Sequence, residues 1–187
     1  MLPSVKECFN LMEKYRMLTN IKEHSIVVAK VAKIIARGLN NAGIKISLQK
    51  VIAGALLHDI GKTPSLQSGG DHSKIGANIC LENGFEEIAE IVREHVRLVH
   101  FDVNDPPDER EVVFYADKRV NHNKVVPLEE RLAYVIKRYT KSPHEPLARA
   151  IKDNFVLCKT VEKKLFKFLP FSPHDLSNLV KDETLYS

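Results

Sequence analysis

Hydrophobic residues recur at helical spacing along almost the whole chain. They return every three or four positions, and no stretch alternates apolar and polar residues as a half-buried strand does. Asn20, Ser47 and Asp71 precede such segments and are predicted to be N-caps, whereas Gly43 is predicted to end a helix. The expected helical ranges are 3–18, 20–40, 47–61, 71–84, 85–98, 109–120, 127–139 and 143–168, with a short helix after Pro173. The pattern therefore predicts an all-α fold.

Two segments interrupt the helical pattern. Residues 63–70 carry Gly and Ser and are predicted to form a loop, and residues 102–108 contain two prolines and are predicted to form a turn. No internal repeat or low-complexity tract divides the chain. We therefore expect a single domain over residues 1–187, a bundle of about eight or nine helices. Its core is expected at about 20–140, followed by a C-terminal helical extension at about 141–187.

Composition and charge narrow the class of protein. A chain of 187 residues that is 44% hydrophobic is large enough for one sizeable core. The formal net charge is +4, but it is spread out, and no run of five like charges occurs. This mild excess suits an anionic substrate or a contact with RNA and is weak evidence for either, and we expect no stable nucleic-acid partner. Self-association into a homo-oligomer stays open.

The cysteines and the apolar segments indicate a cytoplasmic protein. Cys8, Cys80 and Cys158 are far apart and form no C-x-x-C pair, which is typical of reduced thiols and not of a disulfide framework. No apolar stretch reaches about 18 residues, so we expect no membrane span.

The pair His58-Asp59 carries the strongest chemical signal. It ends the predicted helix 47–61, directly after the almost fully apolar stretch VIAGALL at 51–57. A helix without a polar face is buried, so both side chains must find a partner inside the protein, because an unpaired buried carboxylate is strongly unfavourable. That partner is either another side chain or a metal cation.

Four more polar residues are expected to face inward from other helices. Each lies on the same helix face as a series of apolar residues: His24, His72, His95 and Asp117. Each alone is more typical of a hydrogen-bonded core histidine or, for Asp117, equally typical of a helix cap or an arginine partner. Together with His58 and Asp59 they favour a metal site, because imidazole and carboxylate are usual ligands of Fe, Mn, Co, Ni or Zn. Four histidines and two aspartates exceed the needs of one tetrahedral ion and match two divalent cations that share a carboxylate.

The order of these residues resembles a known family. His24, then His58-Asp59, then Asp117 resembles the H…HD…D signature of the HD superfamily of metal-dependent phosphohydrolases, and HDIGK at 58–62 is similar to its HDIG subgroup. The resemblance covers about residues 20–140 and implies an all-α HD-type bundle with the HD pair at its centre.

The resemblance also implies a ligand set. His72 and His95 are similar to the two additional histidines of binuclear HD enzymes, such as the HD-type diadenosine tetraphosphate hydrolases. By this analogy His24, His58, Asp59 and Asp117 hold a first cation, Asp59 bridges, and the other two histidines complete the second site. The HH-x-x-x-x-G-Y-P hallmark of cyclic-di-GMP phosphodiesterases is absent, because Glu94 precedes His95 and no Gly-Tyr-Pro follows.

The expected activity is metal-dependent phosphohydrolysis. A metal-bound hydroxide would cleave a phosphoester or phosphoanhydride of a small phosphorylated substrate, expected to be a nucleotide. Asp59 and Lys62 are the candidate catalytic residues, with Lys62 neutralising phosphoryl charge as a point cation. Weaker candidates for contacting substrate, each also typical of a plain surface charge, are Arg93, Lys118 and Arg119.

Two other functions use the same residues. Some HD-fold proteins hold a mixed-valence di-iron centre that activates O2, and a non-catalytic HD module would bind a nucleotide without turnover. The sequence does not distinguish among a phosphomonoester, a nucleotide, a dinucleoside polyphosphate and a cyclic phosphodiester as substrate.

Overall fold

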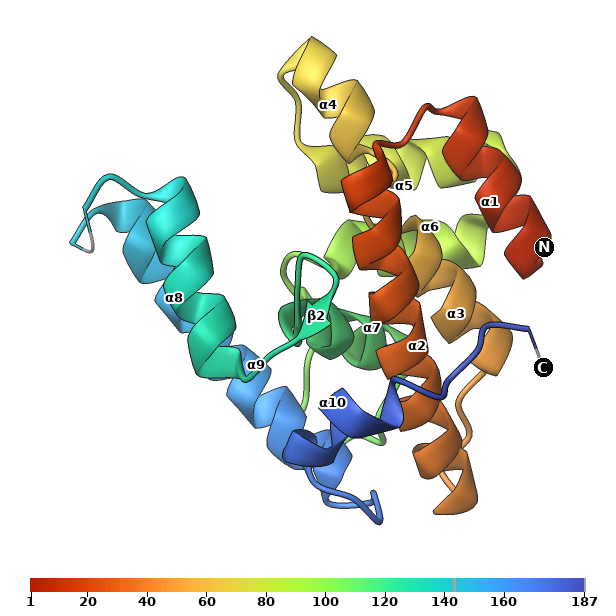
Figure 1. Ribbon diagram of the computed structural model, residues 1–187, viewed down its shortest axis with the longest axis vertical. Coiled ribbons are helices and arrows are strands. Elements are labelled where there is room, and N and C mark those ends of the chain that lie inside the picture. Colours follow the sequence, from red (N-terminus) through yellow and green to blue (C-terminus); the bar gives the residue numbers. More distant parts are fainter. Residues whose placement is uncertain (143, 187) are drawn as a thin grey trace.

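The apolar stripes of the sequence pack helix on helix, and the resulting fold is a mostly helical single domain (Figure 1). The computed structural model describes residues 1–142 and 144–186. Its α-helices are α1 (Val5–Lys14), α2 (Thr19–Asn41), α3 (Leu48–Leu57), α4 (Lys62–Ser68), α5 (His72–Glu82), α6 (Glu86–Glu94), α7 (Glu109–Lys118), α8 (Leu128–Tyr139), α9 (Pro146–Phe166) and α10 (Leu176–Leu179). A 3-10 turn (Pro173–Asp175) precedes α10. The predicted all-helical class and bundle are confirmed.

Helix α3 lies at the centre of this bundle. Every residue from Val51 to Leu57 is buried, as expected for a helix with no polar face. It packs against α2, α6, α7 and α1, and α2 runs beside it over most of its length (Figure 1). Gly54 brings α6 close, because a Cβ there would lie 2.7 Å from the Cγ2 atom of Ile91. The end of α3, and therefore the His58-Asp59 pair, is held in the core.

Two of the three predicted caps are confirmed. The Ser47 side chain accepts a hydrogen bond from the Lys50 backbone N–H, and the Asp71 side chain accepts one from the N–H of Ser73. The cap predicted at Asn20 is wrong: α2 begins one residue earlier, at Thr19, after Leu18 as its N-cap. Leu18 has extended backbone angles, and its carbonyl already accepts from the following turn. Asn20 therefore lies inside the first turn of α2 and does not act as its N-cap.

The predicted loop at 63–70 is largely a helix. Helix α4 spans Lys62–Ser68 and ends at Gly69, which has a left-handed φ of 74°. Pro64 lies in its first turn, where a missing N–H costs nothing, and the hydroxyl of Ser65 donates to the Lys62 carbonyl at 2.7 Å. Residues typical of loops therefore form a short helix here, while the helix predicted over 47–61 ends at Leu57.

A β-hairpin with strands of two residues each follows α7. The sequence had predicted that the helix continues to residue 120. Strand β1 (Val120–Asn121) pairs antiparallel with β2 (Lys124–Val125), and His122 in the turn has a positive φ of 54°. Strands this short leave no alternating pattern in a sequence. The hairpin directs the chain from α7 into α8.

Helices α8 and α9 pack on each other and lie to one side of the bundle (Figure 1). The predicted start of α9 at Pro143 lies outside the described residues, as does the last residue of the predicted domain, Ser187; the helix itself begins at Pro146. The boundary expected near residue 140 stays a prediction. Within the described residues, no helix is long and apolar enough to cross a membrane.

Candidate metal centre

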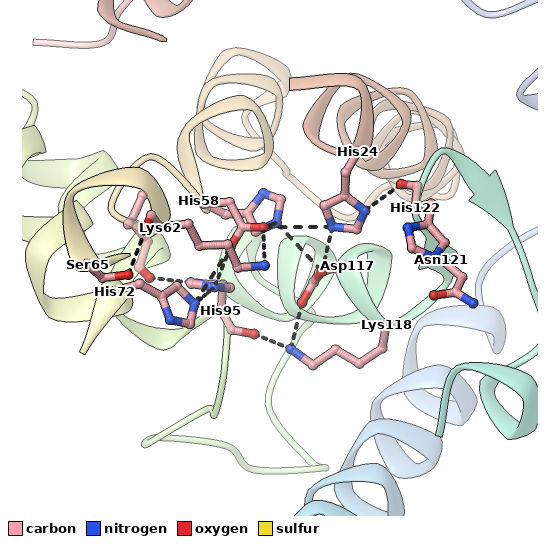
Figure 2. Close-up of polar contacts among 12 residues, drawn as sticks. His24, His58, Lys62, Ser65, His72, His95, Asp117, Lys118, Asn121 and His122 are labelled. Atoms are coloured by element: carbon pink, nitrogen blue, oxygen red, sulfur yellow. Dashed lines mark hydrogen bonds and ion pairs between the residues drawn. The ribbon is translucent and has the colours of Figure 1, made fainter. Parts of the chain in front are cut away.

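The six predicted ligands converge in the middle of the bundle (Figure 2). They come from five places in the chain: α2, the end of α3, the start of α5, the end of α6, and α7. All are buried except His72, whose side chain is 29% exposed. Two groups of donor atoms have every member within 4.8 Å of the others, namely His24, His58, Asp59 and Asp59, His72, His95. The structure brings the predicted ligands together, and their role in binding metal stays a prediction.

Asp59 divides the cluster into two halves. Its Oδ2 atom lies 3.3 Å from Nε2 of His58 and 4.0 Å from Nε2 of His24. Its Oδ1 atom faces the other way, 3.4 Å from Nε2 of His95 and 3.7 Å from Nε2 of His72. One carboxylate therefore offers one oxygen to each pair of imidazoles, which is the geometry of a bridging ligand.

Asp117 joins the first half. Its Oδ1 atom lies 3.0 Å from Nε2 of His24 and 3.6 Å from Nε2 of His58. In the second half, the Nε2 atoms of His72 and His95 are 3.3 Å apart. Figure 2 shows His72 and His95 on one side of the centre and His24 and Asp117 on the other.

Backbone carbonyls orient the imidazoles. The Nδ1 atoms of His58 and His95 lie 2.7 Å and 2.6 Å from the carbonyls three residues earlier, at the ends of α3 and α6. These carbonyls are available because the last turn of a helix lacks intrahelical donors. Nδ1 of His24 lies 2.8 Å from the His122 carbonyl in the hairpin turn. With the proton on Nδ1, each Nε2 lone pair points into the cluster, as a metal ligand requires.

Unsatisfied atoms gather at the centre. Among the residues that the structure describes, Nε2 of His58 and both carboxylate oxygens of Asp59 are buried without a hydrogen-bond partner. Such atoms are strongly unfavourable unless something binds them. Two helices also end here with His58 and His95 as C-caps, and the partial negative charge of a helix C-terminus favours cations. The residues fit a pair of divalent cations.

The charges of the carboxylates are strongly stabilised. Burial disfavours ionised Asp59, but His58 and Lys62 outweigh it and hold the pKa of Asp59 well below its ordinary value. The pKa of Asp117 is likewise lowered despite burial, by Lys118, His24 and His58. Both residues are therefore anionic at neutral pH, as cation ligands should be.

The imidazoles differ in protonation. Burial and the neighbouring His95 lower the pKa of His72 to about 4, and burial also lowers the pKa of His95. Burial acts the same way on His58, but Asp59 and Asp117 outweigh it and raise the pKa of His58 to about 9. The second pair is therefore neutral at pH 7, with its lone pairs available, whereas His58 is protonated and would have to release its Nε2 proton to bind a cation.

Gly61 and Gly76 let the start of α5, which carries His72, pack closely against the turn after His58-Asp59. A Cβ at Gly61 would lie 2.1 Å from the His72 carbonyl oxygen and 2.5 Å from the backbone N of Gly76. The start of α5 therefore packs directly on the turn after Asp59. This close approach places His72 within reach of Asp59 Oδ1.

Lys62 lies at the exposed edge of the centre. Its Nζ atom is 2.7 Å from Asp59 Oδ2, an ion pair and not an aligned hydrogen bond, and the side chain is 33% exposed. Burial lowers and Asp59 raises its pKa, with a net upward shift, so the ammonium is charged. The structure places Lys62 beside the cluster, and its catalytic role stays a prediction.

Lys118 and Arg119 are not surface charges. Lys118 is buried; its ammonium donates to the His95 carbonyl and to Asp117 Oδ2, 3.0 Å away, and so ties α6 to α7. Arg119 is 3% exposed and donates to the carbonyls of Val126 and Pro173. Backbone carbonyls and neighbouring side chains satisfy both of these residues, a role that their sequence context does not reveal.

Arg119 connects the hairpin to the C-terminal segment, while Arg93 is exposed on α6. The substrate contacts expected of both stay predictions.

Residues of the hairpin and of α8 complete the wall beside Asp117. Arg131 places its Nη2 atom 3.8 Å from Asp117 Oδ1, and its Nη1 donates to Asn121 Oδ1 at 3.0 Å. The backbone of His122 orients His24. No sequence signal singled these residues out, because their role depends on contacts between the hairpin turn, α8 and the centre that a helical pattern does not show.

Two cavities lie away from the centre. One, of about 260 Å³, is lined by residues including Ile52 and Leu185, and the other, of about 360 Å³, by residues of the segment 99–111. Neither is lined by any of the six cluster residues. The partly exposed side chains of His72 and Lys62 mark where the cluster meets solvent.

Comparison with known proteins identifies the family. The HD domain matches residues 21–121, more than half of the chain. An uncharacterized protein from Methanocaldococcus jannaschii is 30% identical over 145 residues, covering 71% of this chain and 84% of that protein. A tRNA (cytidine(56)-2'-O)-methyltransferase from Thermoplasma volcanium is 29% identical, covering 80% of this chain but 45% of the methyltransferase.

A ribonuclease Y from Thermosipho melanesiensis is 31% identical, covering 71% of this chain and 24% of the ribonuclease. No solved structure is a significant match. The family match and the convergence of the histidines and aspartates of its signature agree: the chain belongs to the HD domain family.

Proposed function

We propose that this protein is a metal-dependent phosphohydrolase with two divalent cations, one on each side of Asp59. The observation that carries the proposal is the Asp59 carboxylate, whose two buried oxygens lack hydrogen-bond partners and face separate histidine pairs. In this proposal His24, His58, Asp59 and Asp117 hold one cation, and Asp59, His72 and His95 hold the other. Fe, Mn, Co, Ni and Zn all suit such ligands.

The cations, when bound, would polarise a phosphoryl oxygen and lower the pKa of a water molecule at the site. The protein contributes fixed geometry: carbonyls lock the imidazoles, and Lys118 holds Asp117 in place. Lys62 would release Asp59 to the cations and turn its ammonium toward the phosphoryl oxygens, because its side chain is 33% exposed and lies at the edge of the centre. There it would offset the negative charge that develops during transfer.

The substrate is proposed to be a nucleotide-like phosphoester or phosphoanhydride. The HDIG string at 58–61 and the pair His72 and His95 resemble binuclear enzymes that act on dinucleoside polyphosphates. A ribonuclease Y and a tRNA methyltransferase, whose names indicate RNA substrates, also share sequence with the chain. Since the chain spans less than half of each of those two relatives, their whole activities are not carried over.

The test is hydrolysis of a panel of nucleotides and p-nitrophenyl phosphate esters by the protein loaded with Mn²⁺ or Co²⁺. We expect phosphate release from at least one nucleotide, abolished by Asp59→Ala and retained by the matched control Asp153→Ala, which changes an exposed aspartate on α9. Oxygen uptake by the iron-loaded protein without phosphate release would favour a di-iron oxygenase instead. Nucleotide binding without turnover under any of these metals would indicate a non-catalytic module.

A further inference from the structure

Arg131 approaches the centre from a helix that contributes no predicted ligand. It lies in the first turns of α8, and its side chain is only 14% exposed. Its Nη2 atom is 3.8 Å from Asp117 Oδ1, the oxygen that also lies next to His24 and His58. A permanently charged guanidinium therefore lies directly beside the first half of the cluster.

Part of the hydrogen-bonding capacity of the Arg131 guanidinium is unused. Nη1 donates to Asn121 Oδ1 at 3.0 Å, but Nε is buried without a hydrogen-bond partner among the described residues. The distance to Asp117 is too long for a hydrogen bond, and Lys118 already donates to that carboxylate at 3.0 Å. Arg131 is thus not needed to satisfy Asp117. A guanidinium with unused donors at the edge of a cation site suits an anion with several oxygens.

Two aromatic rings fix the position of this guanidinium. Its central carbon lies 5.6 Å from the ring centroid of Tyr134, one turn further along α8, within the range of a cation–π contact. The Tyr134 ring in turn meets the His122 ring edge-on, with centroids 5.1 Å apart. The carbonyl of His122 also orients His24. The hairpin turn therefore fixes the positions of both Arg131 and a predicted ligand.

We propose that Arg131 is a substrate-binding residue that donates hydrogen bonds to a phosphoryl group held beside Asp117. The proposal rests on the proposed function and deepens it: Lys62 contacts the phosphoryl group at one edge of the centre and Arg131 at the other. Its planar fork matches two phosphoryl oxygens, which a lysine cannot do. No candidate substrate contact from the sequence included Arg131, whereas Arg119, which was one, donates to backbone carbonyls.

The test uses inorganic phosphate as the probe and the Mn²⁺-loaded full chain. Phosphate affinity is measured by calorimetry and bound manganese by elemental analysis. We expect Arg131→Gln to weaken phosphate binding by about tenfold or more, and Arg131→Lys to lose part of the affinity, with bound manganese unchanged in both. Arg149→Gln, which changes an exposed arginine on α9, is the matched control and should bind phosphate like the wild type.

Three results would overturn the assignment. They are unchanged phosphate affinity in Arg131→Gln, loss of manganese from that variant, which would show that Arg131 only supports Asp117, and a manganese-loaded wild type that binds no phosphate. Arg131-dependent phosphate binding by a protein that hydrolyses no phosphate ester would instead contradict only the proposed function. The results that contradict the assignment of Arg131 therefore differ from the result that contradicts the proposed function.

Discussion

Asp59 has an environment that suits a cation better than a proton. It is 1% exposed, and its nearest polar neighbours are three imidazole nitrogens within 3.7 Å and the Lys62 ammonium at 2.7 Å. A carboxylate in the core is tolerated when positive charge compensates it. Here Lys62 and His58 lie beside Oδ2, whereas Oδ1 faces two neutral imidazoles. The position of Asp59 between the two histidine pairs makes both halves of the centre depend on one side chain.

Substitutions within the cluster should therefore remove cations unequally. Asp59→Ala is expected to lose both bound cations, because it removes an oxygen from each half, whereas His95→Ala should keep the first and lose the second. Elemental analysis of each variant after Mn²⁺ loading and desalting measures this, with circular dichroism as the check on folding. Two equivalents of manganese retained by Asp59→Ala, or by His95→Ala, would show that the ligands are assigned wrongly.

The cysteines of the core give a prediction about pH. Burial raises the pKa of the Cys8, Cys80 and Cys158 thiols to about 12. The upward shift means that the protonated thiol persists in the folded protein well above pH 8.5, where a thiol in the unfolded chain begins to ionise. We expect none of the three to react with Ellman's reagent at pH 8.5 until guanidinium unfolds the chain. Rapid reaction of the native protein would contradict this burial.

Candidate ligands could be predicted from the sequence because their helices are amphipathic. Each of His24, His72 and His95 lies on the apolar face of its helix. Because that face packs on the core, the side chain points inward. Lys118 and Arg119 could not be placed in this way. Their partners include carbonyls distant in the sequence, at His95 and Pro173, and long charged side chains are ordinarily at the surface.

The helices converge on the centre through their ends. Helices α3 and α6 deliver their C-caps to it, and α5 delivers its first residue. The turn between α3 and α4 is tight because Gly61 touches the backbone of α5. Sequence pattern predicted most of these helices, but not α4 or the β1–β2 hairpin, since elements of seven and two residues carry too few positions to show a period.

The Gly61 contact can be tested against another glycine. A Cβ in Gly61→Ala would meet backbone atoms 2.1 Å and 2.5 Å away, so α5 must move, and we expect a loss of more than about 3 kcal/mol in the free energy of unfolding. The second cation should be lost as well, because His72 moves with α5. Urea unfolding and manganese content measure the two effects.

Gly84→Ala is the control for this substitution. Gly84 has a φ of 77°, and no atom lies within 4 Å of the position that an alanine Cβ would take, so only backbone strain of about 1–2 kcal/mol is expected. Equal effects of the two substitutions would show that the close approach of α5 to Gly61 is unimportant.

The centre links parts of the molecule that are far apart in the chain. Its residues span positions 24 to 117 and join α2, α3, α5, α6 and α7. Cations bound there would cross-link most of the bundle, whereas the α8–α9 pair contributes only Arg131 to the wall among the residues described. Ligands that bind only the folded state shift the unfolding equilibrium toward it.

Stability should therefore depend on metal. At a free Mn²⁺ concentration of 100 times its dissociation constant, one site contributes about 2.7 kcal/mol, so the melting temperature should rise on adding Mn²⁺ and fall on adding EDTA. Differential scanning calorimetry of the wild type and Asp59→Ala measures the effect, and the variant should show little shift. A similar rise in both proteins would mean that manganese stabilises the fold from another place.

The most direct test of the two-cation centre is a crystal of the protein grown with Mn²⁺, measured for anomalous scattering. We expect two anomalous peaks, one between His24, His58 and Asp117 and one between His72 and His95, with an oxygen of Asp59 bound to each. A single peak, or none, at this place in the folded bundle would contradict the bridging role of Asp59.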